Sequence, residues 1–176
     1  MDNRKIYVAG AGAVSAAGIS VADNVAFIKS GKTALAAPRR FSTAVEVPVG
    51  EAGITDIDLK DRLGIPHWEI ISRTALLGLS ALTEALEDYA VRCGSRMGDA
   101  KVALISGTSV GGMDLSEVFW EGHRADLDGG DPEMLKMHSP GAVTSAIARY
   151  LADRKNVENL TFVTTVSTAC SAAGNA

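Results

Sequence analysis

The sequence predicts an α/β fold built on a mostly parallel sheet, and three observations support this prediction. Short apolar runs rich in β-branched residues alternate with longer segments in which apolar residues recur at helical spacing. The chain holds 18 glycines but only 5% aromatic residues, which favours close packing of helices on a sheet over a core of aromatic rings. Apolar residues make up 47% of the 176 positions and charged residues 22%, as in a globular domain with a sizeable core.

Four elements are predicted in the first half of the chain. Residues 5–10 form an apolar run that ends in glycine, which is typical of a buried strand entering a tight turn. Residues 20–30 have helical spacing, and a glycine follows them. Residues 40–49 alternate like a strand but contain a proline, which restricts them to a sheet edge or a hairpin arm. Residues 68–92 carry the longest helical stripe of apolar residues.

Five elements are predicted in the second half. Residues 101–106 form a second buried strand before a glycine-rich loop, and residues 113–123 form a helix. A serine followed by proline opens a further helix at 139–151, because serine caps helix N-termini and proline fits the first helical position. Residues 160–166 form a β-branched strand, and the small residues 171–176 begin the next helix. This alternation predicts right-handed crossovers between parallel strands.

Charge and cysteine content narrow the classes of function. The net charge is −4 and no basic cluster exceeds the pair Arg39-Arg40, so nucleic acid is not an expected partner. No run approaches eighteen apolar residues, and the N-terminal segment has the pattern of a strand rather than a signal sequence. We therefore expect no membrane span and a cytoplasmic location. Cys93 and Cys170 are too few and too far apart for a disulfide framework, and neither belongs to a zinc motif.

Loops after the three predicted strands are the candidate sites, because chemistry in parallel sheets is found at the carboxyl ends of strands. The loop that begins at Gly10 lacks the third glycine of a dinucleotide-binding motif, since Ser15 stands there. The loop G-T-S-V-G-G, which begins at Gly107, lacks the lysine and hydroxyl residue of a phosphate-binding loop. We interpret the glycines of the first loop as points of close backbone packing. For the second loop, relief of backbone crowding is one interpretation, and a functional role that depends on whether Cys170 needs close neighbours stays open. We expect no cofactor.

Cys170 is the candidate for chemistry in the third loop. It lies where a strand turns into a helix, among small residues that leave room for a sharp turn. Such a turn exposes the sulfur near a helix N-terminus, whose dipole favours the thiolate form, and offers backbone N–H groups to an oxyanion. The alternative is a buried structural cysteine that acts as a small apolar side chain, and the residues alone leave this open.

The other cysteine and the histidines are assigned structural roles. Cys93 falls at the end of the long predicted helix, where we interpret it as a partly packed residue. The three histidines, His67, His123 and His138, share no metal-binding spacing and fall on predicted loops and helix ends. We therefore expect no metal site and assign the histidines surface or capping roles.

Five segments together resemble the β-ketoacyl synthases of the thiolase superfamily, the condensing enzymes of fatty-acid and polyketide synthesis. In chain order, these segments are I-Y-V-A-G-A-G-A-V-S-A-A-G, I-S-R-T-A-L-L-G-L-S-A-L-T-E-A-L-E-D, V-A-L-I-S-G-T-S-V-G-G-M, S-P-G-A-V-T-S-A-I-A-R-Y-L and V-S-T-A-C-S-A-A. The T-A-C-S core is similar to the family's nucleophile motif, and its combination with the glycine loop strengthens the resemblance. It implies a thiolase-like fold with helices on both faces of the sheet.

The resemblance also implies a reaction and its partners. Cys170 would accept an acyl chain from acyl carrier protein, and the acyl-enzyme would condense with a decarboxylated malonyl unit carried in the same way. The backbone N–H of Cys170 would contribute to the oxyanion hole. Val110 falls where the family has a gate to the acyl pocket, and Met137 and His138 fall near its far end at a dimer interface. The expected assembly is a homodimer, or a heterodimer with a related subunit.

Some features depart from the family pattern. Ser145 stands where the family has asparagine, and Arg149 where it has a small residue. The family fold is duplicated, so the resemblance implies that residues 1–176 are an N-terminal half-domain that stops just after the nucleophile. The second half, with two histidines and a lysine, would be missing, and the fragment alone would be inactive. Two alternatives are a thiolase or other cysteine acyltransferase that uses coenzyme A, and a non-catalytic structural partner subunit; the latter lacks the nucleophile in some polyketide systems.

Overall fold

The computed structural model describes residues 5–94, 100–155, 157 and 159–176. The chain divides into two compact units. Unit 1 comprises the described parts of Met1–Leu63 and Gly78–Ser95, and unit 2 comprises those of Gly64–Leu77 and Arg96–Ala176. The long helix α3 (Arg73–Cys93) contributes residues to both units.

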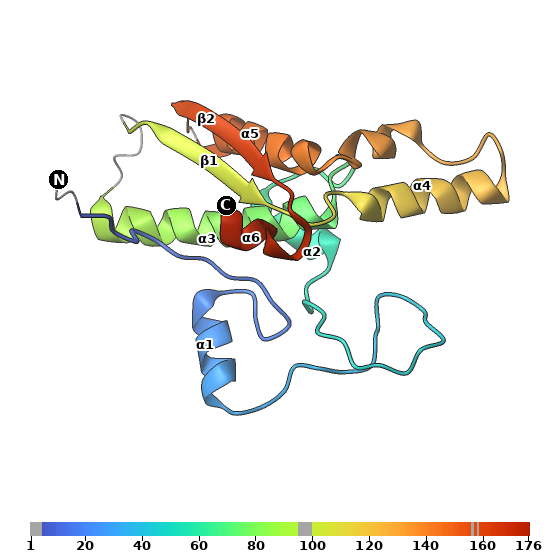
Figure 1. Ribbon diagram of the computed structural model, residues 1–176, viewed down its shortest axis with the longest axis horizontal. Helices are drawn as coiled ribbons and strands as arrows, with labels where there is room; N and C mark the ends of the chain where they lie inside the picture. The colour runs from blue at the N-terminus through green and yellow to red at the C-terminus, as the bar shows by residue number, and fades with distance from the viewer. Residues whose placement is uncertain (1–4, 95–99, 156, 158) are drawn as a thin grey trace. The chain divides into compact units, whose positions relative to one another are not determined.

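The elements follow in the order that Figure 1 shows. Unit 1 contains α1 (Val21–Lys29), α2 (Asp56–Leu63) and most of α3. The elements of unit 2 are β1 (Val102–Gly107), α4 (Met113–Ala125), the 3-10 helix η1 (Pro132–Met137), α5 (Pro140–Lys155), β2 (Leu160–Val166), the 3-10 helix η2 (Ala169–Ser171) and α6 (Ala172–Asn175).

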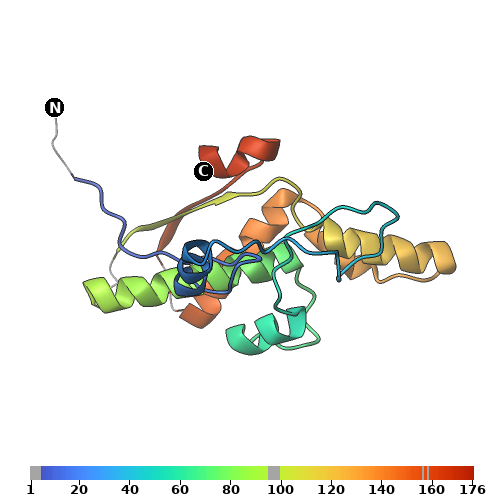
Figure 2. The same cartoon turned by 90° about the horizontal axis from the view of Figure 1, so that it is seen from below.

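A parallel pair of strands forms the sheet of unit 2. The register of β1 and β2 runs from Val102 opposite Leu160 to Gly107 opposite Val166. Both α5 and α6 contact the pair, and they lie on opposite faces of it (Figure 2). The predicted α/β class, the parallel pairing and the helices on both faces are therefore confirmed.

Helix α5 packs on β2 through one continuous buried stripe. The serine cap predicted at its start is present, since Ser139 Oγ accepts a hydrogen bond from Ala142 N at 3.2 Å. Thr144 is 2% exposed, and its hydroxyl lies 2.6 Å from that of Thr165 on β2. The other buried side chains of the stripe are Val143, Ala146, Ile147, Tyr150 and Leu151. Burial of this stripe and the paired hydroxyls hold α5 against the sheet.

The first glycine loop packs against α3 within unit 1. A Cβ on Gly10 would collide with the carbonyl oxygen of Ala85, and one on Gly12 with that of Ala81. Two carboxylates of α3 fix the same segment: Asp88 accepts a hydrogen bond from Ala11 N at 3.1 Å, and Glu84 accepts one from Ala13 N at 2.9 Å. These contacts favour the interpretation of close backbone packing for this loop.

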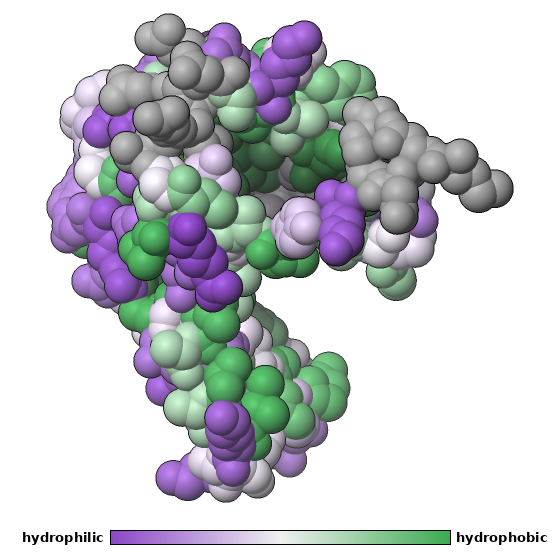
Figure 3. Space-filling model, turned by 90° about the vertical axis from the view of Figure 1, so that its left-hand side faces the viewer, coloured by the Kyte–Doolittle hydropathy of each residue, from purple (hydrophilic) through white to green (hydrophobic). Residues whose placement is uncertain are grey.

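The strand predicted at residues 5–10 is absent from the structure. Residues 5–10 are irregular, and Ile6, Tyr7 and Val8 are 98%, 76% and 85% exposed. A strand requires a neighbour to accept and donate its backbone hydrogen bonds, and the sheet that the described residues form consists of β1 and β2, with no third strand paired to either outer edge. The prediction is wrong because the apolar run has no pairing strand within the described residues. Other hydrophobic residues are also visible at the surface, as Figure 3 shows in green for one face of the molecule.

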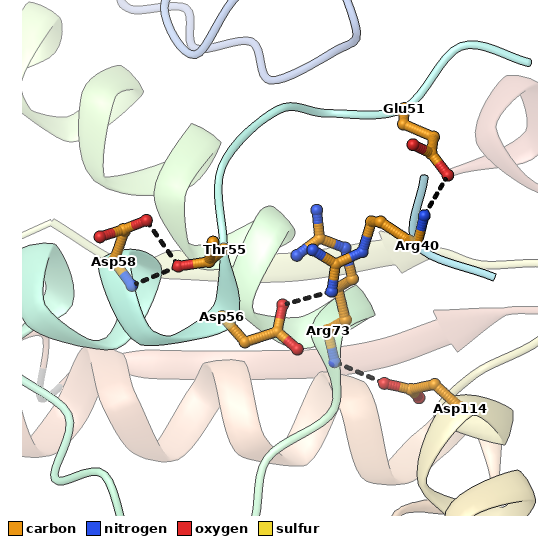
Figure 4. A network of polar contacts seen from close by, with 7 residues as sticks. All are labelled: Arg40, Glu51, Thr55, Asp56, Asp58, Arg73 and Asp114. Carbon is orange, nitrogen blue, oxygen red and sulfur yellow. Dashed lines mark hydrogen bonds and ion pairs between the residues drawn. The ribbon is translucent and has the colours of Figure 1, made fainter. Parts of the chain in front are cut away.

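The hairpin arm predicted at residues 40–49 is reduced to one bridge. Ala36 and Val49 exchange backbone hydrogen bonds, and residues 37–48 between them form a loop rather than strands. Glu51 braces this loop by accepting a hydrogen bond from the backbone N–H of Arg40 (Figure 4) and another from that of Arg39. The hydrogen bond from Arg40 lowers the pKa of Glu51 below its usual range, with Arg39 adding to the effect.

Helix α2 was not predicted, although its cap is visible in the sequence. Thr55 Oγ1 accepts a hydrogen bond from Asp58 N at 3.1 Å, and Asp56 pairs with Arg40 at 3.4 Å (Figure 4). A threonine followed three residues later by an acidic residue is a helix-start pattern. The apolar residues of this short helix are few, so periodicity gave no signal.

Helix α3 begins later than the predicted residue 68. Ser72 caps it, because its Oγ accepts a hydrogen bond from Ala75 N at 3.2 Å. Asp114, at the start of α4, accepts a hydrogen bond from Arg73 N at 2.7 Å (Figure 4). The apolar stripe continues upstream of the cap into the turn at Pro66–Glu69, which is why spacing alone placed the start too early.

Candidate active site

Cys170 lies in the turn that connects β2 to α6. The strand ends at Val166, the 3-10 helix η2 spans Ala169–Ser171, and α6 begins at Ala172. The Cys170 side chain is exposed. The structure thus differs from the alternative of a buried structural cysteine, and it places the thiol at the carboxyl end of a parallel strand as the sequence predicted.

The backbone next to the thiol is in a disfavoured conformation. Ala169 has a φ of 51° and is the one non-glycine residue with positive φ among the described residues. The left-handed region costs an L-residue with a Cβ about 1–2 kcal/mol. Such conformations persist only where surrounding contacts fix them, and they cluster at functional sites.

One carbonyl oxygen joins the glycine loop to this turn. Ser109, in the loop after β1, donates a hydrogen bond from its Oγ to the carbonyl oxygen of Ala169 at 2.8 Å. The backbone N–H of Ala172 donates to the same oxygen. Both lone pairs of the Ala169 carbonyl are therefore engaged, one by the loop and one by the start of α6.

The side chains around the turn form a small polar network. Asn175 Nδ2 lies 2.9 Å from Thr168 Oγ1 and 3.1 Å from Ser171 Oγ. Ser171 Oγ in turn donates to the carbonyl oxygen of Thr168 at 2.9 Å. Asn175 and Ser171 therefore tie the terminal helix α6 back to the turn.

Gly107 allows α6 to lie close to the end of β1. A Cβ at this position would be 2.7 Å from the carbonyl oxygen of Ala172, closer than real Cβ contacts come. Ala172 itself is 2% exposed. Thr108 N continues the strand ladder by donating to the carbonyl oxygen of Val166 at 3.1 Å. The two strand ends and the first turn of α6 thus form one packed unit beneath the thiol.

Gly111 and Gly112 of the glycine loop pack against the backbone where η1 ends and α5 begins. Gly111 has a φ of 63°, and a Cβ there would be 2.9 Å from the backbone N of Pro140. A Cβ at Gly112 would collide with the carbonyl oxygen of Met137. Thr108 Oγ1 accepts a hydrogen bond from Gly111 N at 3.2 Å and closes the loop on itself. The glycines of this loop are thus points of close backbone approach.

The three residues predicted to line an acyl pocket lie at or beside the contact between the glycine loop and residues 137–140. Val110 lies at the loop between Ser109 and Gly111, and its side chain is 56% exposed. Met137 is 8% exposed beneath Gly112, whereas His138 is exposed and its Nδ1 lies 2.9 Å from Ser116 Oγ. Backbone contacts of Gly111 and Gly112 bring the loop that carries Val110 next to Met137 and His138. Ser116 was missed, because nothing in its spacing links it to a histidine 22 residues away.

The remaining predicted residues lie elsewhere. Cys93 is exposed at the end of α3, so the prediction that it is partly packed is wrong. The reason is that the last turn of α3 is itself exposed, as the 87% exposure of Val91 shows. His123 stacks on Phe119, with ring centroids 5.7 Å apart, and meets Trp120 edge-on at 5.5 Å.

The two departures from the family pattern occupy the surface of α5. Ser145 is exposed, and Arg149 forms an ion pair with Glu69 at 3.4 Å. No group of three or more His, Cys, Asp or Glu side chains in the described part of the chain is arranged to hold a metal ion. Nor does that part contain a helix with the length and apolar character needed to cross a membrane.

Comparison with known proteins gives likenesses to solved structures. No family model matches the chain, and no curated protein matches it. The chain is similar to a solved structure, the ishigamide ketosynthase/chain length factor, with a TM-score of 0.74 and 21% sequence identity. The match covers 92% of this chain and 39% of that chain, so the present chain spans about two fifths of its neighbour's length. The likeness is one of fold, and it confirms the predicted thiolase-like α/β fold class.

Proposed function

We propose that Cys170 is the nucleophile of an acyl-transfer enzyme of the β-ketoacyl synthase type. The observation that carries the proposal is the exposed thiol at a left-handed turn, tied by Ser109 to the glycine loop, in a chain with a ketosynthase-like fold. In the first step the Cys170 thiolate attacks the carbonyl carbon of an acyl thioester. The bond to the carrier sulfur breaks, the carrier leaves as a thiol after taking up a proton, and the acyl chain stays on Sγ.

The proposed donor is acyl carrier protein, and the proposed second substrate is malonyl-acyl carrier protein. Loss of carbon dioxide from the malonyl unit would supply the carbanion that attacks the acyl-enzyme, releasing Cys170 and forming a β-ketoacyl product. Backbone N–H groups at the turn, including that of Cys170, are the proposed oxyanion donors. Val110, Met137 and His138 are proposed to line the acyl chain's path, a role supported by their contact through Gly111 and Gly112.

We further propose that the chain is the N-terminal part of a longer condensing enzyme. In the family that the sequence resembles, the histidines of condensation belong to the second half of the duplicated fold. The 39% coverage of the structural neighbour supports this assignment. So does the exposure of apolar side chains on the two strands, with Ile105 at 47%, Phe162 at 55% and Val163 at 44%. On this proposal the chain is acylated slowly and does not condense by itself.

A second candidate is a non-catalytic partner subunit of a cytoplasmic heterodimer. The name of the structural neighbour includes a chain length factor beside the ketosynthase, which favours this candidate. The presence of Cys170 favours a catalytic subunit instead. A thiolase-type enzyme is a third candidate, and it differs in taking its acyl group from coenzyme A.

The test is acylation of the purified chain. Hexanoyl-coenzyme A and hexanoyl-acyl carrier protein are incubated with the protein, and intact mass followed by peptide mapping identifies the modified residue. We expect one acyl group on Cys170, none in Cys170→Ala, and little on Cys93, which is equally a free exposed thiol. Preference for the carrier-protein thioester supports the synthase, and preference for coenzyme A supports a thiolase-type enzyme. Equal or absent labelling of the two cysteines would favour the non-catalytic subunit.

A further inference from the structure

We propose that Ser109 is a positioning residue for Cys170, acting by holding Ala169 in its left-handed conformation. The inference rests on the proposed function, since it concerns how that nucleophile is presented. It assigns Ser109 a task that the glycine loop's packing does not require.

The geometry places Ser109 at the strained residue rather than at the thiol. Its hydroxyl donates to the Ala169 carbonyl oxygen at 2.8 Å, and Ala169 is the residue with a φ of 51°. An alanine relaxes to the right-handed region unless contacts oppose the change. Rotation about the bonds of Ala169 reorients the peptide that leads into Cys170, and with it the direction of the Cα–Cβ bond that carries the sulfur.

The donor is itself held in place. Thr108, which precedes Ser109, is 8% exposed and donates from its backbone N to Val166 at 3.1 Å. Its hydroxyl accepts from Gly111 N at 3.2 Å on the other side of Ser109. Ser109 is therefore anchored on both flanks, so its hydroxyl is pre-positioned and loses little freedom on bonding.

Ser109 is exposed, which makes the inference testable without unfolding the protein. Removing an exposed hydroxyl leaves no cavity and no buried unsatisfied group. A change confined to Cys170 would then report positioning, whereas a general structural role would show itself as lower stability and changed labelling of both cysteines.

The test compares four variants with the unmodified chain. These are Ser109→Ala, Ser109→Thr, Ala169→Gly and the double variant Ser109→Ala with Ala169→Gly. The first readout is the rate of Cys170 acylation by hexanoyl-acyl carrier protein, together with the ratio of Cys170 to Cys93 alkylation by iodoacetamide. The second is the ¹³C resonance of Ala169 in alanine-labelled protein, identified by its loss in Ala169→Gly.

We expect Ser109→Ala to lower the acylation rate about three- to tenfold, the range given by one neutral hydrogen bond. Ser109→Thr keeps the donor and should stay within about twofold of the unmodified chain. Glycine takes up positive φ without strain, so the Ser109→Ala effect should shrink to less than about twofold in the Ala169→Gly background. The Ala169 resonance should move toward right-handed values in Ser109→Ala.

The two proposals fail in different ways. If Ser109→Ala leaves both the Ala169 resonance and the Cys170 alkylation ratio unchanged, the positioning role of Ser109 is overturned. If no thioester acylates Cys170 in the unmodified chain, the proposed function is overturned, and the Ala169 resonance alone decides whether Ser109 holds the turn. A fall in stability with equal changes at both cysteines also counts against positioning.

Discussion

The two cysteines are both exposed, but the backbone beside each is built differently. Cys93 is the last residue of α3, and Gly94 after it takes up a φ of 76°. Cys170 lies just past the end of β2, and Ala169 before it takes up a φ of 51°. Each thiol is thus flanked by one left-handed residue, and in the first case that residue is glycine while in the second it is alanine.

The difference shows which turn depends on its surroundings. Glycine adopts positive φ at no steric cost and commonly ends helices, so the end of α3 needs no further contact to hold its shape. Alanine does not, and the turn at Cys170 accordingly has a hydrogen bond from Ser109 and a network through Asn175. Exposure of a thiol is therefore a weaker sign of function than the contacts that fix the backbone beside it.

The largest expected effect comes from adding one methyl group at Gly107. In Gly107→Ala the new Cβ meets the carbonyl oxygen of Ala172 at 2.7 Å, and backbone atoms cannot rotate away. We expect a loss of about 1–3 kcal/mol in the free energy of unfolding, as for overpacked interiors. Displacement of α6 should also bring the alkylation rates of Cys170 and Cys93 closer together. Urea denaturation and iodoacetamide labelling measure the two effects.

Gly174, which lies in α6 itself, offers a matched control. A Cβ at Gly174 would meet no atom within 4 Å, so Gly174→Ala should leave both measurements unchanged or raise stability slightly. Equal losses in the two variants would show that an added methyl group destabilises this region even where it meets no other atom. The close approach at Gly107 would then have no special part in presenting Cys170.

Much of unit 2 could be predicted because its signals are local. The β-branched run predicted at 160–166 is strand β2, and the serine-proline start of α5 lies where its cap chemistry put it. Cys170 could be singled out because small residues after a strand indicate a sharp turn. The link from Ser109 to Ala169 spans 60 residues, so no local pattern could show it.

Two failures, at residues 5–10 and at the start of α3, have the opposite cause. The run at residues 5–10 has the composition of a strand, yet a strand exists only when a second one pairs with it. The start of α3 was misplaced because apolar spacing continued past Ser72, whose role as a cap is decided by hydrogen bonds rather than by hydropathy. Both predictions were inferred from apolar residues in the sequence, and these do not determine which hydrogen bonds a strand or a helix start will form.

A smaller effect is expected from the polar network at the turn. Asn175→Ala removes the donor to Thr168 and Ser171, at a cost of about 1 kcal/mol because the network is exposed. Thr168→Val removes the acceptor, and a double-mutant cycle in urea separates the pair from its surroundings. If the two losses simply add, the contact between Asn175 and Thr168 contributes nothing of its own, and α6 would then be held by its other contacts, among them the buried Ala172.

The smallest effect on stability is expected in α3, the helix that ends at Cys93, and it depends on pH. Asp88 accepts a hydrogen bond from Arg92 at 2.6 Å, which lowers the pKa of Asp88 below its ordinary value of 3.8. The stabilisation is present above that ordinary value and is lost as pH falls through the lowered pKa, because the folded state then binds the proton less readily than the unfolded state. Asp88→Asn should therefore have a lower melting temperature than the unmodified chain at pH 7, and this gap in melting temperature should close on acidification toward pH 2.

Asp153→Asn removes the same charge from an exposed position on α5 and serves as the control. A gap that stays constant with pH would mean that the loss comes from the changed side chain and not from the lowered pKa of Asp88. The alkylation of Cys170 should be unaffected in every case.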